Sequence, residues 1–183
     1  MKLYKLNVGC GTNIRDGWVN LDISPLPGVD IIHDLGMLPL PFENLTFEEI
    51  LCQDVLEHVE YIPILEDLHR IMRKNAEITI RVPHFTSRHN FTDPTHKKMF
   101  SIDTFNFFVK NSFQNDGRSY YFNFSFELLV SSKIIFERGS LVFFLNPLFE
   151  KLFNISPRVQ RIYEATFLSR FFPACNILVT LKK

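Results

Sequence analysis

Two glycines and a nearby acidic residue form the first group of residues whose spacing could support chemistry. Gly9 and Gly11 flank Cys10 directly after an apolar run, and Asp22 closes the next apolar run. Glycine lets the backbone pass close to a ligand where a side chain would collide. A carboxylate at the end of a second strand accepts hydrogen bonds from ribose hydroxyls. The pattern therefore predicts a site for the nucleoside half of a cofactor.

The details of this pattern distinguish between cofactors. A dinucleotide site requires a third glycine at the head of a helix and an acid about 20 residues further on. Here the third glycine is missing, and only ten residues separate Gly11 from Asp22. A nucleoside without a pyrophosphate fits better, which favours S-adenosylmethionine. A nicotinamide-dependent oxidoreductase is the disfavoured alternative.

Three histidines stand near expected strand ends, and imidazole suits proton transfer because its pKa is close to neutral. His58 follows the fourth expected strand, His84 follows the fifth, and His96 lies in the loop beyond. Methyl transfer requires an aligned acceptor and, for a hydroxyl, removal of its proton. We predict His84 or His58 as the base, with His96 as a further candidate. A structural contact under the next helix is an equally good interpretation of His58.

The same loop contains residue types that ligate metals. His84, His89, Asp93 and His96 follow one another within a short run, and imidazole and carboxylate are suitable ligands. Their spacing matches no closed site, however. We therefore predict solvated loop residues or substrate contacts here, and no metal.

Hydrophobic periodicity places these residues on an alternating framework. Strands are expected over 3–8, 18–22, 29–33, 47–53, 76–82, 118–126, 133–137 and 176–181. Helices are expected from Ile62 to Met72, from a Ser101 cap to Phe108, from Asn146, and from Ser156 to Phe172. Strands that alternate with helices indicate a parallel α/β sheet.

Four blocks in the first half of the chain resemble the small class I, Rossmann-like S-adenosylmethionine-dependent methyltransferases. They are Leu6-Asn7-Val8-Gly9-Cys10-Gly11, Asn20-Leu21-Asp22, Asp34-Leu35 with Leu38-Pro39, and Asp54-Val55-Leu56-Glu57-His58-Val59. The resemblance implies a Rossmann-like α/β fold with a seven-stranded, mostly parallel sheet and an antiparallel last strand. The segment between Gly11 and Asp22 is too short for the first helix that is usual in this family, so we expect a shortened one. Aromatic-rich helical additions follow toward the C-terminus.

The resemblance also implies a role for individual residues. Gly9, Cys10 and Gly11 would lie against the methionine and ribose of the cofactor, and Asp22 with Ile23 would meet the ribose. The adenine would lie at Asp34 and Leu35, and the methionine end at Gln53, Asp54 and Val55. Asn7 stands where an acidic residue often precedes the first glycine, so backbone carbonyls would hold much of the cofactor's amino group. The product would be S-adenosylhomocysteine.

Composition and charge disfavour nucleic-acid-binding, secreted and membrane-spanning proteins. Basic and acidic residues balance at 20 each, which disfavours a nucleic-acid partner. Neither a signal peptide nor a membrane span is recognised, and Cys10, Cys52 and Cys175 are interpreted as reduced thiols. We therefore expect a cytoplasmic protein.

We expect a single domain over 1–183. Residues 1–85 would bind the cofactor, 86–175 would form the acceptor side, and 176–183 would contain the closing strand. The second half holds most of the 20 phenylalanines. Core packing, with a possible homodimer interface, is the favoured interpretation of residues 143–153 and the helix after them. An apolar acceptor pocket or a peripheral membrane contact is the alternative.

The expected function is methyl transfer to a small-molecule acceptor, most simply an oxygen of a sugar-like or lipid-linked metabolite. The block Asp93-Pro94-Thr95-His96 is similar to one in family members of cell-surface sugar pathways. A catalytically silent protein that binds S-adenosylmethionine on the same fold is the alternative.

Overall fold

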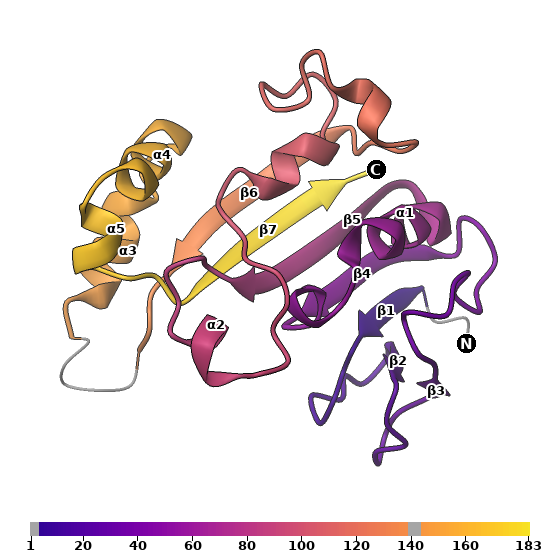
Figure 1. The fold of residues 1–183 in the computed structure, drawn as a ribbon. Coiled ribbons are helices and arrows are strands. Elements are labelled where there is room, and N and C mark those ends of the chain that lie inside the picture. The colour runs from indigo at the N-terminus through magenta and orange to yellow at the C-terminus, as the bar shows by residue number, and fades with distance from the viewer. Residues whose placement is uncertain (1–3, 139–143) are drawn as a thin grey trace.

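A seven-stranded sheet runs through the protein in the computed structural model, which describes residues 4–138 and 144–183 (Figure 1). Its order is β3-β2-β1-β4-β5-β7-β6. The strands are β1 (Lys5–Val8), β2 (Val19–Asp22), β3 (Ile31–Ile32), β4 (Phe47–Gln53), β5 (Met72–Pro83), β6 (Leu128–Ile135) and β7 (Asn176–Lys182). Leu3, expected in the first strand, lies outside the described residues.

Strand direction fixes where the site must lie. β1 pairs in parallel with β2 and β4, β3 is parallel to β2, and β5 is parallel to β4. β7 pairs antiparallel with both β5 and β6. The predicted α/β class, the seven strands and the antiparallel last strand are confirmed. The strand order reverses between β1 and β4, and ligands of such sheets bind beyond the carboxyl ends of the strands at that point.

The expected shortening of the first helix is also confirmed, since turns occupy the connection from β1 to β2. Buried amides hold this loop in place of a helix. Asn7 Nδ2 donates to the Asn13 carbonyl at 2.8 Å and to Asn20 Oδ1 at 3.0 Å. Asn20 Oδ1 also accepts from the Arg15 backbone N–H, and Asn20 Nδ2 donates to Asp30. Each buried polar atom named here thus has a partner, as stable burial requires.

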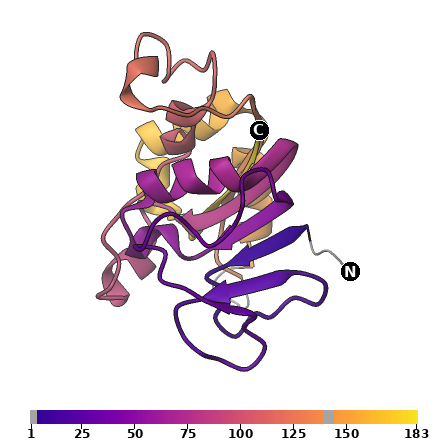
Figure 2. The ribbon, with the colours of Figure 1, turned by 90° about the vertical axis from the view of Figure 1, so that its right-hand side faces the viewer.

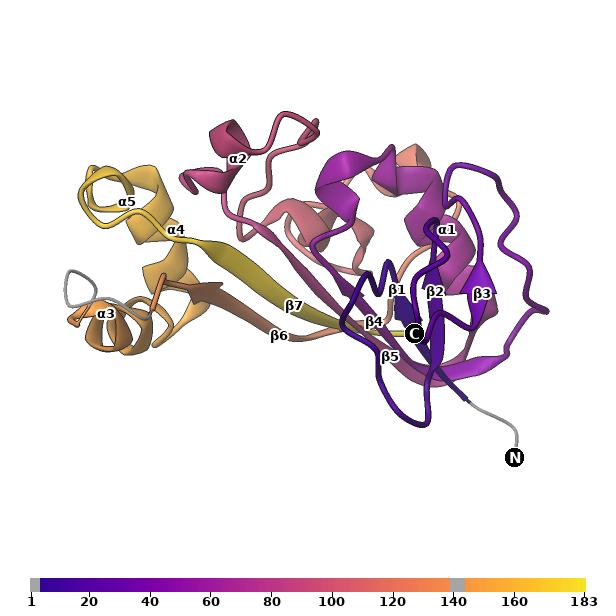
Figure 3. The ribbon, with the colours of Figure 1, turned by 90° about the horizontal axis from the view of Figure 1, so that it is seen from below.

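Helix α1 (Tyr61–Ile71) provides most of the helical cover of the sheet's centre. Its inward residues Ile64, Leu65, Leu68 and Ile71 are buried at helical spacing. Figures 2 and 3 show α1 on one face of β4 and β5, while the opposite face of these two strands carries no described helix. That open face is polar: Thr79 of β5 and Thr180 of β7 bond there through their hydroxyls at 3.2 Å.

The C-terminal half departs from the predicted elements in four places. Residues 118–126 form the 3-10 turn η3 (Ser119–Tyr121) and a loop instead of a strand, and β6 occupies 128–135 instead of 133–137. The expected helix to Phe172 is divided into α4 (Pro157–Ala165) and α5 (Leu168–Phe171). The 3-10 turn η2 (Thr104–Phe108) begins after Asp103 rather than after the expected Ser101 cap, and it has no side-chain cap. The pattern over 118–126 misleads because aromatic contacts among Phe108, Phe122 and Phe124, rather than a backbone ladder, order that segment.

The phenylalanine-rich residues divide between core and surface. Phe136 and Phe153 of α3 (Asn146–Phe153) pack with the fully buried Tyr163 of α4. By contrast, Phe167 and Phe171 are 67% and 74% exposed. Phe143 lies outside the described residues. Among the helices that the structure describes, none combines the length and apolar character needed to cross a membrane.

The His69 ring at the end of α1 makes stability depend on pH. It packs against Phe124 and Phe126 with ring centroids 5.7 and 5.2 Å away. Burial, reinforced by Lys183, lowers the pKa of His69 to about 4 from its ordinary 6.5. Between these values the unfolded chain binds a proton that the folded protein excludes, so the free energy of unfolding must fall as the pH drops.

We therefore predict that His69→Asn flattens the stability profile between about pH 6.5 and 4. The measurement is urea unfolding at several pH values for the variant and the wild type. An equal slope for both proteins in that window would contradict the assignment.

Candidate active site

The glycine loop lies at the carboxyl end of β1, tightly packed against the end of β4. Gly9 and Gly11 have φ angles of +60° and +50°. A Cβ on Gly9 would stand 2.3 Å from Val55 Cγ2, whereas a Cβ on Gly11 would meet nothing within 4 Å. Gly9 is therefore needed for packing, and Gly11 leaves space beside its backbone.

Asp22 is positioned next to this open space. Its Oδ2 accepts the Gly11 N–H at 2.8 Å, and its Oδ1 accepts the Ser24 N–H at 2.9 Å. A carboxylate oxygen has more than one lone pair, so each retains capacity for a ligand hydroxyl. Ile23 is 62% exposed beside it, an apolar surface that is open to a ligand.

Two residues of the predicted cofactor set are buried under the loop. Asn7 is 3% exposed and its amide is bonded within the protein, so it supports the loop. Cys10 is 5% exposed, and burial raises the pKa of its thiol. Both residues thus act on a ligand mainly through the backbone that they hold in place.

The predicted adenine residues follow β3 at the same edge of the sheet. Asp34 is exposed and its Oδ1 accepts the Gly36 N–H at 2.8 Å, while Leu35 is buried. At the end of β4, Gln53 is followed by Asp54, which has a φ of 56° and forms an ion pair with Arg81 of β5. The Arg81 Nε lies 2.9 Å from Asp54 Oδ1. This pair joins the tips of β4 and β5 where the methionine end is expected.

His84, predicted as a base, is fully buried after β5. Its Nδ1 lies 2.7 Å from Thr86 Oγ1 and its Nε2 lies 3.0 Å from Glu164 Oε1. The same Glu164 oxygen accepts the Ile102 N–H at 2.7 Å. With both ring nitrogens engaged and no exposed surface, His84 does not meet an acceptor in this structure, and we do not retain it as the base.

We predict that His84→Leu lowers the free energy of unfolding by about 1–3 kcal/mol, because Glu164 loses a buried partner. Cofactor binding by the folded variant should be unchanged. The check is urea unfolding together with calorimetric titration of S-adenosylhomocysteine. His33→Leu serves as a control, since the His33 Nε2 bonds only to the Met37 carbonyl at an exposed position. Unaltered stability of the His84 variant would rule out this structural role.

The two other histidines meet directly beyond β4. His58 belongs to the 3-10 turn η1 (Leu56–His58), and its ring centroid lies 4.7 Å from that of His96. Glu57, which the sequence interpretation overlooked, completes the cluster: one ligand atom from each of the three side chains lies within 4.8 Å of the others. The Glu57 carbonyl also accepts the N–H of Lys97 and of Lys98. These backbone bonds bring the loop that carries His96 against η1.

Burial perturbs two members of this Glu57–His58–His96 cluster. Glu57 is 1% exposed, and burial raises the pKa of its carboxyl to about 7. Burial and the neighbouring His58 lower the pKa of His96. Perturbed groups of this kind collect at functional sites. A Glu-His pair within the resembling block was the signal available in the sequence, but nothing local indicated that Glu57 points inward.

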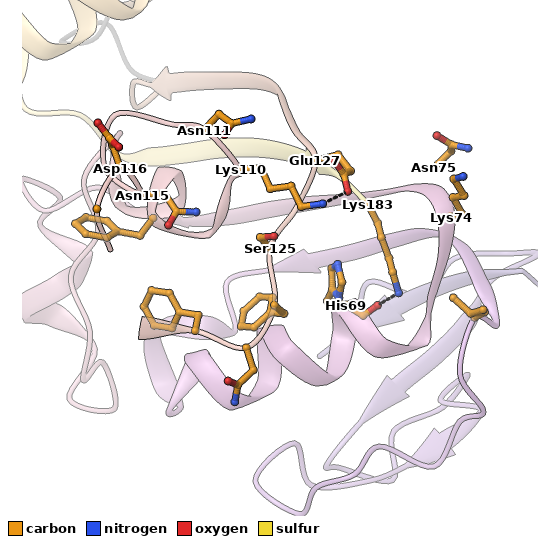
Figure 4. Close-up of a pocket in the computed structure, with 16 residues that line it drawn as sticks. His69, Lys74, Asn75, Lys110, Asn111, Asn115, Asp116, Ser125, Glu127 and Lys183 are labelled. Atoms are coloured by element: carbon orange, nitrogen blue, oxygen red, sulfur yellow. Dashed lines mark hydrogen bonds and ion pairs between the residues drawn. The ribbon is translucent and has the colours of Figure 1, made fainter. Parts of the chain in front are cut away.

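Two cavities lie at opposite edges of the sheet. The larger, about 810 Å³, lies where β4 begins and β7 ends; Figure 4 shows its His69, Lys110 and Lys183. Lys110 pairs there with Glu127, and the Lys183 ammonium donates to the His69 carbonyl. This cavity is remote from the glycine loop.

The smaller cavity, about 460 Å³, lies at the carboxyl edge between the end of β5 and the start of β7. It is lined by side chains of Arg88, Phe149, Phe171 and Phe172 among others. Its edge of the sheet is the one that carries the glycine loop.

Comparison by sequence finds little likeness to known proteins. No family model matches the chain. An alignment 86 residues long, which covers 42% of this chain, is 33% identical to the uncharacterized protein MJ0638 of Methanocaldococcus jannaschii. The match spans only 38% of that relative.

Solved structures match almost the whole chain. A SAM-dependent methyltransferase from Archaeoglobus fulgidus is 19% identical, with a TM-score of 0.58 over 98% of this chain and 85% of that one. The S-adenosylmethionine-dependent methyltransferase from Mesorhizobium loti is 12% identical, with a TM-score of 0.56 over 100% of this chain and 91% of that one. The chain has the class I methyltransferase fold. At these identities the likeness defines the fold and leaves the reaction open.

The reaction requires its own argument because this fold carries more than one chemistry. The [4+2]-cyclase SpnF also shares the class I methyltransferase fold with this chain, with 13% identity and a TM-score of 0.56 over 98% of this chain and 73% of that one. Function must therefore be argued from the residues at the carboxyl edge.

Proposed function

We propose that this protein binds S-adenosylmethionine and transfers its methyl group to a small-molecule acceptor. The observation that carries the proposal is the combination at one sheet edge of the Gly9–Gly11 loop, the Asp22 carboxylate and the Glu57–His58–His96 cluster. The first two suit a nucleoside, and the third lies beyond the adjacent strand. Methyltransferases among the structural neighbours support the same donor.

The assigned roles follow the geometry. Ribose hydroxyls would bond to Asp22, and the backbone beside Gly11 would contact the cofactor closely. Asp34 and Leu35 would receive the adenine, and Gln53, Asp54 and Val55 would border the methionine end. The residue roles remain predictions that binding measurements can test one by one.

The transfer itself requires little covalent chemistry from the protein. An acceptor oxygen would form a bond to the methyl carbon as the carbon–sulfur bond breaks, and sulfur would keep that electron pair in S-adenosylhomocysteine. The acceptor hydroxyl would lose its proton. His58 or His96 would accept this proton, since His84 is buried in contacts with Thr86 and Glu164.

The acceptor class is inferred from a cavity at the same edge of the sheet. The cavity of about 460 Å³ at the carboxyl edge has aromatic and charged lining residues, which suits a molecule with apolar and polar parts. An oxygen of a sugar-like or lipid-linked metabolite fits this lining. The exposed Phe167 and Phe171 are consistent with a peripheral membrane contact or a homodimer interface.

A silent binding protein on the same scaffold remains the second hypothesis, because Asn7 replaces the usual acid and is engaged in the loop. Binding of S-adenosylmethionine without turnover would favour it.

We predict that Gly11→Ala weakens S-adenosylmethionine binding at least tenfold while Gly17→Ala does not. Both glycines have positive φ angles, +50° and +78°, and both face open space, so their backbone strain is comparable. Only the Gly11 methyl group would enter the proposed cofactor space. Isothermal titration calorimetry gives both affinities, and thermal unfolding shows that both variants fold.

Wild-type protein should also be stabilised against heat by S-adenosylhomocysteine and unaffected by NAD. Absence of binding in the wild type, or equal affinities for the two alanine variants, would reject the proposed cofactor site.

A second prediction concerns the acceptor. Incubation with a radiolabelled methyl donor and fractionated cell extract should label the small-molecule or lipid fraction, and leave nucleic acid and protein unlabelled. Gly11→Ala, with its impaired donor site, is the matched control for enzymatic transfer. Label in RNA or DNA alone would contradict the small-molecule assignment.

A further inference from the structure

We propose that Glu57, His58 and His96 bind a divalent transition-metal ion beside the methyl-donor site. The three side chains come from two segments, η1 and the loop of residues 93–98. One potential ligand atom from each lies within 4.8 Å of the others. Two imidazoles and a carboxylate form a ligand set that is common for zinc and for iron, cobalt or manganese.

Two buried atoms of the cluster lack hydrogen-bond partners among the residues that the structure describes. Glu57 Oε2 belongs to a residue that is 1% exposed, and His96 Nδ1 belongs to a side chain that is 8% exposed. Both atoms are inaccessible to solvent and make no hydrogen bond within the described part of the chain. Leaving such atoms without partners is costly, so each requires an explanation. A cation between them would satisfy both lone pairs at once.

Hydrogen bonds among His58, Thr95 and Asp93 fix the tautomer of His58. The Thr95 hydroxyl donates its proton to Asp93 Oδ1 at 2.6 Å and lies 2.8 Å from His58 Nδ1. Because that proton is already committed to Asp93, His58 Nδ1 must donate to Thr95. The proton on Nδ1 leaves Nε2 with a free lone pair, which is the tautomer that a metal ligand needs.

His96 is supported from the same side. Its Nε2 lies 3.7 Å from Asp93 Oδ2, and its buried Nδ1 is the unbonded atom. An N–H on Nε2, facing the carboxylate, leaves the Nδ1 lone pair for the ion. Asp93 thus stands behind both imidazoles, in the position that outer carboxylates take in histidine metal sites.

The geometry also selects the kind of ion. Tetrahedral coordination at about 2.1 Å separates ligand atoms by about 3.4 Å, so atoms within 4.8 Å of one another require only small side-chain shifts. Magnesium and calcium prefer sites made of oxygen atoms. Two nitrogen ligands therefore favour Zn²⁺, Mn²⁺, Fe²⁺ or Co²⁺ over either of them.

With three protein ligands the ion would keep an open position for an oxygen of the acceptor. This role rests on the proposed methyl transfer; binding of the ion does not. A bound divalent ion lowers the pKa of a coordinated hydroxyl, so its proton would leave to water and the oxygen would attack the methyl carbon. His58 and His96 would then act as ligands rather than as bases.

The test is metal binding by the purified full chain, freed of any affinity tag and of metal with a chelator. Calorimetric titration with ZnCl₂, MnCl₂ and CoCl₂ should show about one ion per chain, and MgCl₂ should show no comparable binding. Co²⁺ should also develop visible absorption bands typical of mixed nitrogen and oxygen ligands. Absence of saturable binding by all three transition metals would overturn the proposal.

Variants locate the ion. His96→Ala and Glu57→Gln should each weaken binding at least tenfold, and His33→Ala, a histidine outside the cluster, should leave it unchanged. Thr95→Val should also weaken binding by about tenfold, because the ligand His58 loses its orienting partner. Thr95 is exposed in its contacts with His58 and Asp93, so its variant tests the site even where the buried variants fail to fold. Binding that is unaffected by His96→Ala and Thr95→Val would place the ion elsewhere and reject the assignment.

Metal binding and cofactor binding are measured separately. An ion that binds at the cluster in a protein that does not bind S-adenosylmethionine would leave the metal site standing and reject the proposed function. Cofactor binding without any metal binding would reject the metal site and leave the proposed function standing.

Discussion

Two buried asparagines, Asn7 and Asn20, hold the loop on which the cofactor end of the site depends. Each is 3% exposed, and the 3.0 Å bond between their side chains links β1 to β2 under the glycine turn. A helix usually fills this connection in the class I fold. Here hydrogen bonds to Asn13, Arg15 and Asp30 fix the loop instead. Buried polar networks are rigid when every member is satisfied, so a ten-residue connection can present Gly11 and Asp22 in one place.

The loop also depends on the next strand. Gly9 packs so closely on Val55 that any side chain would collide, which ties the end of β1 to the turn after β4. That turn continues into Glu57 and His58, and the Glu57 carbonyl anchors Lys97 and Lys98. A continuous chain of contacts thus runs from the cofactor loop to His96. These contacts connect the proposed donor end to the proposed acceptor end through η1.

The aromatic residues that follow β6 mainly fill the core at the β6 edge of the sheet. Tyr163 and Phe136 fill the space between β6 and the helices beyond it. Glu164, one residue after Tyr163, reaches back to His84 and to the Ile102 N–H. The acceptor-side loop is consequently held by a helix about 80 residues away. For this reason His84 serves as a structural contact, although it stands just after β5 in a position suited to a base.

The sequence predicted the strands from β1 to β5, the helix over 61–71 and the closing strand, because period and flanking turns are local properties. It also predicted which residues follow the carboxyl ends of the strands, since parallel strand direction follows from the alternation of strands and helices. It predicted only the last part of β6, as a strand over 133–137, and it predicted a strand over 118–126 where the structure has a 3-10 turn and a loop. There Phe122, Phe124 and Phe126 pack around Phe108 or His69, and such contacts between distant segments leave no periodic signal.

The three histidines show most clearly the difference between what local sequence predicts and what tertiary packing decides. The amino-acid sequence by itself determined that His58 and His84 would stand shortly after strand ends and that His96 would lie in the loop beyond, because that depends only on where each strand stops. Tertiary structure decided what surrounds each of them. Burial against Glu164 occupied both nitrogens of His84, while the fold of the loop over 93–98 against η1 brought His96 to His58 and Glu57. The availability of a side chain for chemistry depends on neighbours from remote segments, and only the packed chain specifies those neighbours.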